Sequence, residues 1–271
     1  YAAGHDVDWA EVLSELPDPR PVDLPSYAFL RSPHWLETGT SIPRAPGGAH
    51  PLLGVGRRIP GADLRVHSSQ ISARSPSWIP DHVVMGQVLL PGAAFAELLL
   101  CAGAGSTEPV TLAQVLISAP LHVPSTGDVA LEVTVEAAKD DGLRRVRVHS
   151  AGLSKLDEDP FKLHAEASLL AVADPAPSPV LTLPPPGSRE LERSSAELYQ
   201  ALASHGLRYG PSFQGLRRAW TSGDEVWGEL ELPAATAAEV DRYGLHPALL
   251  DAATHAIAVA AQGAGAAPGD V

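Results

Sequence analysis

One histidine stands in a spacing that suits acid–base chemistry. His82 lies four residues before Gly86 and nine before Pro91, and Gly92 follows directly. Residues 93–101 then carry a single charge, so the histidine precedes a strongly apolar segment. This arrangement is typical of a titratable side chain delivered to a closed apolar cavity. The alternative is a core histidine whose ring is satisfied by a backbone carbonyl group.

A second group of polar side chains lies near the other end of the chain. In the apolar segment 247–261 the only ionisable residues are Asp251 and His255, with Thr254 beside them. Residues four apart share one face of a helix, and the apolar neighbours leave no polar face for them to decorate. A carboxyl group buried there is expected to keep its proton and act as an acid. The alternative is a carboxylate on the helix surface.

Two apolar helices must position these groups. The first is predicted to begin near Pro91 and to run through Cys101, because proline suits the first helical turn and the following residues favour helix. The second spans 247–261. Because nearly every face of each helix is apolar, both are expected to be wrapped by other elements. The first turn offers a free N–H at Gly92, where a carbonyl oxygen or an anion could dock beside His82.

Alternating apolar and polar residues predict antiparallel strands in both halves of the chain. The predicted strands lie at 131–136, 145–149, 163–172, 217–220 and 225–232. Ser194 and Glu197 have the spacing of a capping box, and Gly206 suits the end of the helix that the box begins. Each half therefore combines one apolar helix with several strands.

Composition excludes several classes of protein. The chain has 271 residues, 45% of them hydrophobic, and a formal charge of −13, which argues against a nucleic-acid partner. Its one cysteine has nothing to pair with, and we predict a cytoplasmic protein that is not a membrane protein. The 11 histidines and the cysteine lack zinc-binding spacings, and no Gly-x-Ser-x-Gly elbow is present, so a metal site or a serine hydrolase is not predicted.

Three motifs in order resemble those of dehydratase (DH) domains from modular type I polyketide synthases. His82, Gly86 and Pro91 match the family's His-x3-Gly-x4-Pro motif. Residues 206–213 are similar to Gly-Tyr-x-Tyr-Gly-Pro-x-Phe, although Leu207 replaces the first tyrosine. Residues 246–255 resemble the Pro-x-x-Leu-Asp-x3-Gln/His segment.

The resemblance implies an α+β double hot-dog fold, in which two antiparallel sheets each wrap round a central apolar helix. We expect residues 1–48 to be a proline-rich linker resembling the post-acyltransferase linker, and 49–173 to be the N-terminal hot-dog half. A proline-rich linker at 174–188 would then lead to the C-terminal half at 189–271. That half is expected to be incomplete, because the strands that follow the second helix in the family are missing from the sequence.

The resemblance also implies a hydro-lyase that removes water from a β-hydroxyacyl thioester in polyketide biosynthesis. His82 would be the general base, Asp251 the general acid, and the Gly92 N–H the donor to the thioester carbonyl. His255 would orient Asp251 by a hydrogen bond. Tyr209 would bond to the substrate hydroxyl or support His82, or else serve only in packing. Gly86 and Pro91 would support the site.

No cofactor of the protein's own is implied, since the substrate would arrive on the phosphopantetheine arm of an acyl carrier protein. Neighbouring synthase domains are the other expected partners, and a homodimer stays open. Carrier proteins are usually acidic, so Arg208, Arg217 and Arg218 are candidates for a docking patch, or else simply a solvated face.

Two other functions remain open at this stage. An isomerase that shifts a double bond, or a pyran-forming cyclase of the same fold, would use the same histidine. A catalytically silent structural module of a synthase is the third reading. The His82 imidazole and the Asp251 carboxyl are predicted to face each other across a tunnel, with the Gly92 N–H pointing into the same space and Tyr209 on its wall.

Overall fold

The computed structural model describes most of the chain after residue 49. The described residues are 8, 11, 14, 50–104, 110–153, 160–171, 184–191 and 194–263. The chain divides into two compact units, Tyr1–Gly39 and Thr40–Val271. In the first unit Glu11 and Ser14 are helical, within the short amphipathic piece of the predicted linker. The rest of that linker, and most of the one predicted at 174–188, lie outside the described residues.

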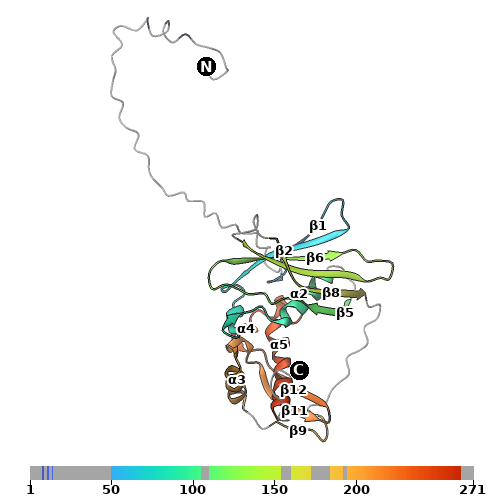
Figure 1. Ribbon diagram of the computed structural model, residues 1–271, viewed down its shortest axis with the longest axis vertical. Helices are drawn as coiled ribbons and strands as arrows, with labels where there is room; N and C mark the ends of the chain where they lie inside the picture. The colour runs from blue at the N-terminus through green and yellow to red at the C-terminus, as the bar shows by residue number, and fades with distance from the viewer. Residues whose placement is uncertain are drawn as a thin grey trace. The chain divides into compact units, whose positions relative to one another are not determined.

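A six-stranded antiparallel sheet forms the first half of the second unit (Figure 1). Its order is β1-β2-β6-β7-β8-β5, with bounds Val55–Arg58, Leu64–Ser72, Asp128–Glu136, Arg144–Gly152, Lys162–Ala171 and Val110–Ile117. Along β6 the side chains of residues 129, 131, 133 and 135 are buried, as the alternation in the sequence predicts. The three strands predicted in this half, 131–136, 145–149 and 163–172, are therefore confirmed in β6, β7 and β8.

The helix α2 (Gly92–Gly103) packs against β5, β6, β7 and β8 of this sheet. Pro91 is its N-cap residue, so the start predicted near Pro91 is confirmed to within one residue. Phe95, Leu98 and Leu99 are buried completely or nearly so, as an apolar helix wrapped by strands requires. At Gly103 an added Cβ would clash with the Leu169 side chain, so glycine lets the helix approach β8 closely.

A small sheet of order β10-β3-β4 joins the two halves. β3 (His82–Val84) and β4 (Gln87–Val88) form a hairpin, and β10 (Leu207–Tyr209) adds from the second half of the chain. The hairpin turns at Met85 and Gly86, which both have positive φ, 49° and 80°. Two such residues in a two-residue loop make a type I′ turn, which explains the glycine of the first motif.

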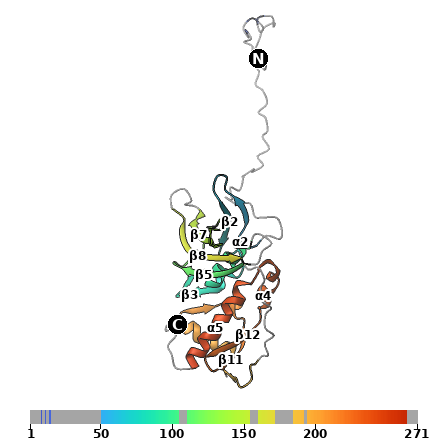
Figure 2. The ribbon, with the colours of Figure 1, turned by 90° about the vertical axis from the view of Figure 1, so that its right-hand side faces the viewer.

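The second half packs a three-stranded sheet against the helix α5 (Pro247–Gly263). The sheet order is β12-β11-β9, with bounds Glu225–Leu230, Leu216–Ser222 and Arg189–Glu190. The other elements of this half are α3 (Ser195–Ser204), η3 (Pro211–Phe213), α4 (Ala234–Ala237) and η4 (Val240–Arg242). The predicted strands at 217–220 and 225–232 and the predicted second apolar helix are confirmed. α5 contacts α2 of the first half, and Figure 2 shows it running lengthwise beside β11 and β12.

Local signals set the bounds of α3. Ser194 and Glu197 form the predicted capping box in both directions, with the Ser194 side chain accepting from the Glu197 N–H. Gly206, with φ 83°, follows the C-cap residue and ends the helix as predicted. The Gly206 carbonyl then accepts a hydrogen bond from the Met85 N–H, 2.8 Å, which ties this turn to the β3–β4 hairpin.

Candidate active site

His82 is held by a hydrogen bond that fixes which ring nitrogen is free. The short 3-10 helix η1 (Ile79–Asp81) ends at His82, which begins β3. The Nδ1 atom lies 2.9 Å from the Leu89 carbonyl oxygen across the hairpin. A carbonyl can only accept, so Nδ1 carries the proton and Nε2 keeps its lone pair. The carbonyl partner expected for a core histidine is therefore present, but it occupies only one nitrogen.

The environment of His82 favours the neutral ring. Its side chain is buried, and this burial lowers the pKa of His82 below its usual value. Asp251 and the Leu89 carbonyl raise the pKa, without cancelling the effect of burial. The imidazole is therefore neutral at pH 7 and able to accept a proton at Nε2.

Asp251 meets His82 from the other half of the chain. It lies in α5 and is buried, with 8% of its surface exposed. Its Oδ2 atom is 4.0 Å from His82 Nε2, so the predicted approach of these two side chains is confirmed. No carbon atom fits between two atoms at this distance. An acyl group must therefore lie alongside the pair, and the expectation that the two residues face each other across a tunnel needs this correction.

His255 lies next to Asp251 but does not hold it as predicted. His255 Nε2 and Asp251 Oδ2 are 3.3 Å apart, within ion-pair range, yet neither atom has a hydrogen-bond partner among the described residues. The other nitrogen of His255, Nδ1, lies 3.3 Å from the Tyr199 hydroxyl oxygen. That hydroxyl donates to the Phe213 carbonyl, 3.1 Å, and accepts from the Leu216 N–H, 3.2 Å. The sequence analysis did not single out Tyr199.

Tyr209 and Phe213 form an aromatic wall on His82. Their ring centroids lie 5.6 and 5.2 Å from that of His82, and Tyr209 pairs with His82 in the β10–β3 register. Tyr209 also contacts His255, with ring centroids 4.2 Å apart. Burial, and then Asp251 and Tyr199, raise the pKa of Tyr209, so its hydroxyl stays a hydrogen-bond donor. It makes no hydrogen bond to any described residue, and a bond to the substrate hydroxyl stays a prediction.

Asp81 clamps the second motif onto the first. Its Oδ2 accepts a hydrogen bond from the Ser212 N–H, 2.9 Å, and its backbone carbonyl accepts one from the Gly210 N–H, 2.7 Å. These two bonds place Tyr209 and Phe213 beside His82. Sequence reasoning missed Asp81, because the partners are backbone groups that leave no mark on residue type.

Replacing Gly210 by alanine tests this clamp. An added Cβ would clash with the side chain of Asp81, including its Cβ at 2.8 Å, so the two segments would be forced apart. We expect a loss of about 1–3 kcal/mol in the free energy of unfolding and weaker turnover, measured by urea denaturation and by steady-state kinetics. Gly152→Ala is the control, because a Cβ there has no neighbour within 4 Å. Unchanged stability in Gly210→Ala would contradict the clamp.

The other predicted support residues have structural roles of their own. Gly86 forms the hairpin turn and Pro91 caps α2, so both shape the backbone on either side of Leu89. The Gly92 N–H, in the first turn of α2, donates to no described residue. A free donor is what the predicted carbonyl-binding role requires, and the role itself stays a prediction.

Family models match both halves of the chain. One described as "Polyketide synthase dehydratase domain" covers residues 50–151, and one described as "Polyketide synthase dehydratase N-terminal domain" covers residues 176–269. The crystal structure of the dehydratase domain from the terminal module of the rifamycin polyketide synthase is 36% identical in sequence. The similarity covers 79% of this chain and 78% of that chain, with a TM-score of 0.72. The chain belongs to the dehydratase domains of modular polyketide synthases.

Two further relatives place this dehydratase domain in context. Polyketide synthase GfsE of Streptomyces halstedii is 38% identical over 96% of the chain, which spans only 7% of that synthase. The bifunctional dehydratase-cyclase domain in ambruticin biosynthesis is 36% identical, over 81% of this chain and 74% of that chain, with a TM-score of 0.71. The predicted double hot-dog fold is confirmed by these structural neighbours.

Two of the three arginines predicted for carrier docking are already paired in this dehydratase domain. Arg217 Nε lies 2.9 Å from Glu231, and Arg218 forms a two-point contact with Glu190 at 2.8 and 2.7 Å. Their charges are therefore largely neutralised. Arg208, exposed on β10, is the one of the three with no such ion pair among the described residues.

One group of metal-ligating residue types occurs in the described part of the dehydratase domain. The ligand atoms of His50, Glu97 and Cys101 all lie within 4.8 Å of one another. Hydrogen bonds account for this group, because the Glu97 carboxylate already accepts four of them. None of the described helices has the length and apolar character needed to cross a membrane.

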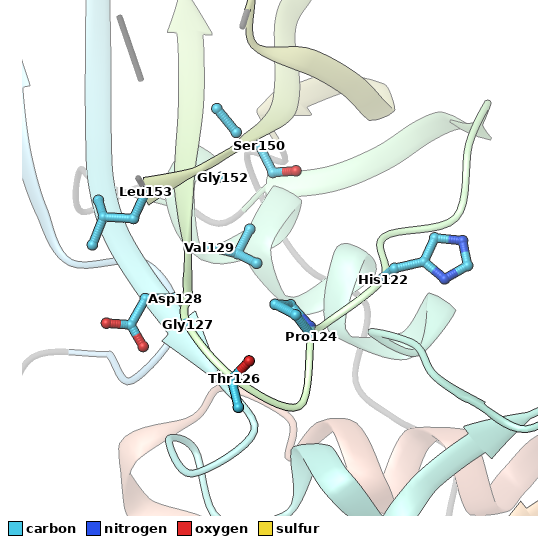
Figure 3. A pocket seen from close by; sticks show the side chains of 10 residues that line it. His122, Pro124, Thr126, Gly127, Asp128, Val129, Ser150, Gly152 and Leu153 are labelled. Atoms are coloured by element: carbon cyan, nitrogen blue, oxygen red, sulfur yellow. The ribbon is translucent and has the colours of Figure 1, made fainter. Parts of the chain in front are cut away.

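A surface hollow of about 510 Å³ opens at the ends of β6 and β7 (Figure 3). Its lining includes His122, Asp128 and Ser150, but neither His82 nor Asp251. It is therefore not the predicted substrate tunnel, which stays a prediction. His122 forms a β-bridge with Leu89, the residue whose carbonyl holds His82.

Proposed function

We propose that the chain dehydrates a β-hydroxyacyl thioester, carried on the phosphopantetheine arm of an acyl carrier protein, to an α,β-unsaturated thioester. The observation that carries the proposal is the meeting of His82 Nε2 and Asp251 Oδ2, 4.0 Å apart in a buried setting. Membership of the dehydratase family supports the reaction class.

His82 acts as the general base. Its Nε2 lone pair takes the proton from the carbon next to the thioester carbonyl, and the electron pair left behind forms the new carbon–carbon double bond. The Leu89 carbonyl stabilises the imidazolium that results, because the Nδ1–H bond to it strengthens as the ring gains charge. The Gly92 N–H would hold the thioester oxygen as negative charge grows there.

Asp251 acts as the general acid. The Tyr199 hydroxyl donates its one hydrogen bond to the Phe213 carbonyl. Its contact with His255 must therefore be a bond that it accepts from the Nδ1–H of that ring. The Nε2 atoms of His255 and His82 then both carry a lone pair, and they lie 3.3 and 4.0 Å from Asp251 Oδ2. For Asp251 to act as the acid, the proton that is transferred is carried on this oxygen. That proton passes to the departing hydroxyl, which leaves as water.

The close spacing of base and acid constrains the stereochemistry. Two groups 4.0 Å apart on one side of the acyl chain reach a proton and a hydroxyl that leave from the same face of the Cα–Cβ bond. We therefore expect a syn elimination. After release of water, the proton on His82 can return to Asp251 across the same short gap, which restores the starting state.

The pH dependence of the reaction follows from the lowered pKa of His82. The base must be neutral, so activity is expected to be low in acid and to rise as the pH increases through that pKa. Because burial lowers it, the midpoint of this rise should lie below about 6.5, the unperturbed histidine value. The measurement is kcat/KM from pH 4.5 to 8. A midpoint above 7 would contradict the assignment.

Mass spectrometry tests the proposed function directly. The protein is incubated with a 3-hydroxyacyl thioester of pantetheine and then with the same acyl group on a carrier protein. Loss of water supports dehydration. A 3-hydroxyacyl group has no double bond to move, so an isomerase is tested with the unsaturated thioester, whose double bond would shift at constant mass and is followed by chromatography. Ring closure after loss of water would favour a cyclase, which the similarity to a bifunctional dehydratase-cyclase supports. No change with either substrate would favour a silent structural module.

The proposed reaction also implies partners. The acyl carrier protein and neighbouring synthase domains are proposed partners, with Arg208 as the remaining candidate for carrier docking. Homodimerisation and a cytoplasmic location stay predictions, as does the absence of a cofactor other than the carrier's phosphopantetheine.

A further inference from the structure

Glu97 is a buried charge that the proposed mechanism does not use. It is the only charged residue of α2, and 2% of its surface is exposed. An uncompensated carboxylate in an apolar core costs several kcal/mol or more, about what a whole domain can spare. Specific hydrogen-bond partners must therefore offset the cost of burying this side chain.

Four donors converge on the Glu97 carboxylate. Oε1 accepts from the Gly244 N–H at 2.6 Å, from His50 Nε2 at 2.9 Å and from the Cys101 thiol at 3.3 Å. Oε2 accepts from the Leu245 N–H at 3.0 Å. Burial by itself would raise the pKa of Glu97, but the bonds from His50, Leu245, Gly244 and Cys101 outweigh it, so the pKa is lowered. The group is therefore ionised and fully hydrogen-bonded.

Two of these donors belong to the backbone that leads directly into α5. His246 follows Leu245, and its Nδ1 accepts from the Ala248 N–H in the first turn of that helix. Asp251 lies one turn further on. Gly244 comes within van der Waals reach of α2, since an added Cβ would lie 3.4 Å from Cys101 Sγ. Glu97 thus fixes, from the first half of the chain, the point at which the helix carrying the acid begins.

We propose that Glu97 is a positioning residue, which through its bonds to the Gly244 and Leu245 N–H groups holds the start of α5 so that the Asp251 carboxyl meets His82. This inference rests on the proposed function. His82 is carried by the first half and Asp251 by the second, so their 4.0 Å separation depends on how α2 and α5 are joined. A displacement of about 1 Å at a reacting group can cost about 10²-fold in rate.

Glu97→Gln is the decisive variant. Glutamine has the same shape as glutamate. Its NH₂ group is a donor, however, and it would face either the Leu245 N–H or the three donors at Oε1, which it repels. We expect kcat to fall about 10- to 10²-fold with KM little changed, because the acid and base would be displaced while the acyl group could still bind. Glu97→Asp is too short to bond both N–H groups, so kcat should also fall, but by less than in Glu97→Gln because its carboxylate repels none of the donors.

Cys101 provides a second readout that does not depend on activity. It is the only cysteine of the chain. Burial, and then the charge and hydrogen bond of Glu97, raise the pKa of its thiol to about 12. Removing the charge in Glu97→Gln should therefore speed alkylation of this single thiol by iodoacetamide. Glu190→Gln is the matched control, because it removes an exposed partner of Arg218 and should change neither kcat nor the alkylation rate.

The outcomes separate this inference from the proposed function. If the wild-type protein does not dehydrate the substrate, the proposed function fails. If the wild type is active and Glu97→Gln melts at a lower temperature but keeps the wild-type kcat, Glu97 is only structural and the inference is overturned. Should Glu97→Gln fail to fold, Glu97→Asp decides, since a wild-type kcat in that folded variant would equally overturn it.

Discussion

His82→Ala is expected to lower kcat/KM for the β-hydroxyacyl thioester by at least about 10²-fold, the scale of a lost general base. The reason is geometric as well as chemical. His82 presents an Nε2 lone pair that is fixed by a hydrogen bond on the other nitrogen and lies 4.0 Å from the acid. The measurement is steady-state turnover, with circular dichroism to show that the variant is folded.

His67→Ala is the control for removing a buried histidine. His67 is buried to a similar degree in β2, and neither of its ring nitrogens has a hydrogen-bond partner among the described residues. It should lose packing and keep activity. If His82→Ala retains turnover within about tenfold of the wild type, His82 is not the base, since that loss is below the usual contribution of general base catalysis.

Asp251→Asn should reduce turnover by a similar factor, at least about 10²-fold. The asparagine amide fills the same space and can still donate a hydrogen bond to the leaving hydroxyl, but it has no proton to deliver. The hydroxyl group therefore has to leave as hydroxide, without a proton from an acid. Single-turnover measurements across the pH range should show that any fall in wild-type activity at high pH is absent from the variant's residual activity.

Asp128→Asn is the control for the loss of a carboxylate. Asp128 begins β6 and accepts a hydrogen bond from Gln70 at 3.1 Å, and its replacement should leave turnover unchanged. Wild-type activity in Asp251→Asn would remove Asp251 from the acid role and leave hydrogen bonding as its only contribution.

The sequence was sufficient to predict the elements that carry His82 and Asp251. α2 and α5 are apolar on nearly every face, and the alternation in β6 and β7 has a period of two, so both patterns depend only on neighbours along the chain. The approach of His82 and Asp251 also followed, because two such helices can be buried only if sheets enclose them.

The contacts that set the geometry could not be predicted in the same way. Asp81 binds the backbone of Ser212, 131 residues away, and Glu97 binds that of Gly244, 147 residues away. Every residue except proline has an N–H, so a backbone donor gives no signal in the residue types. The Asp251–His255 spacing did suggest a hydrogen bond, but two side chains one turn apart need not align, and here they do not.

The small β10-β3-β4 sheet has a consequence for how the molecule folds. It pairs Val84 with Leu207 and His82 with Tyr209, and the loop that this ladder closes contains β5, β6, β7 and β8, four of the six strands of the large sheet. Closing so long a loop costs chain entropy, and this cost comes before the paired strands contribute any stability. We therefore expect the catalytic site to be among the last parts of the chain to acquire native order, and neither half alone to acquire it.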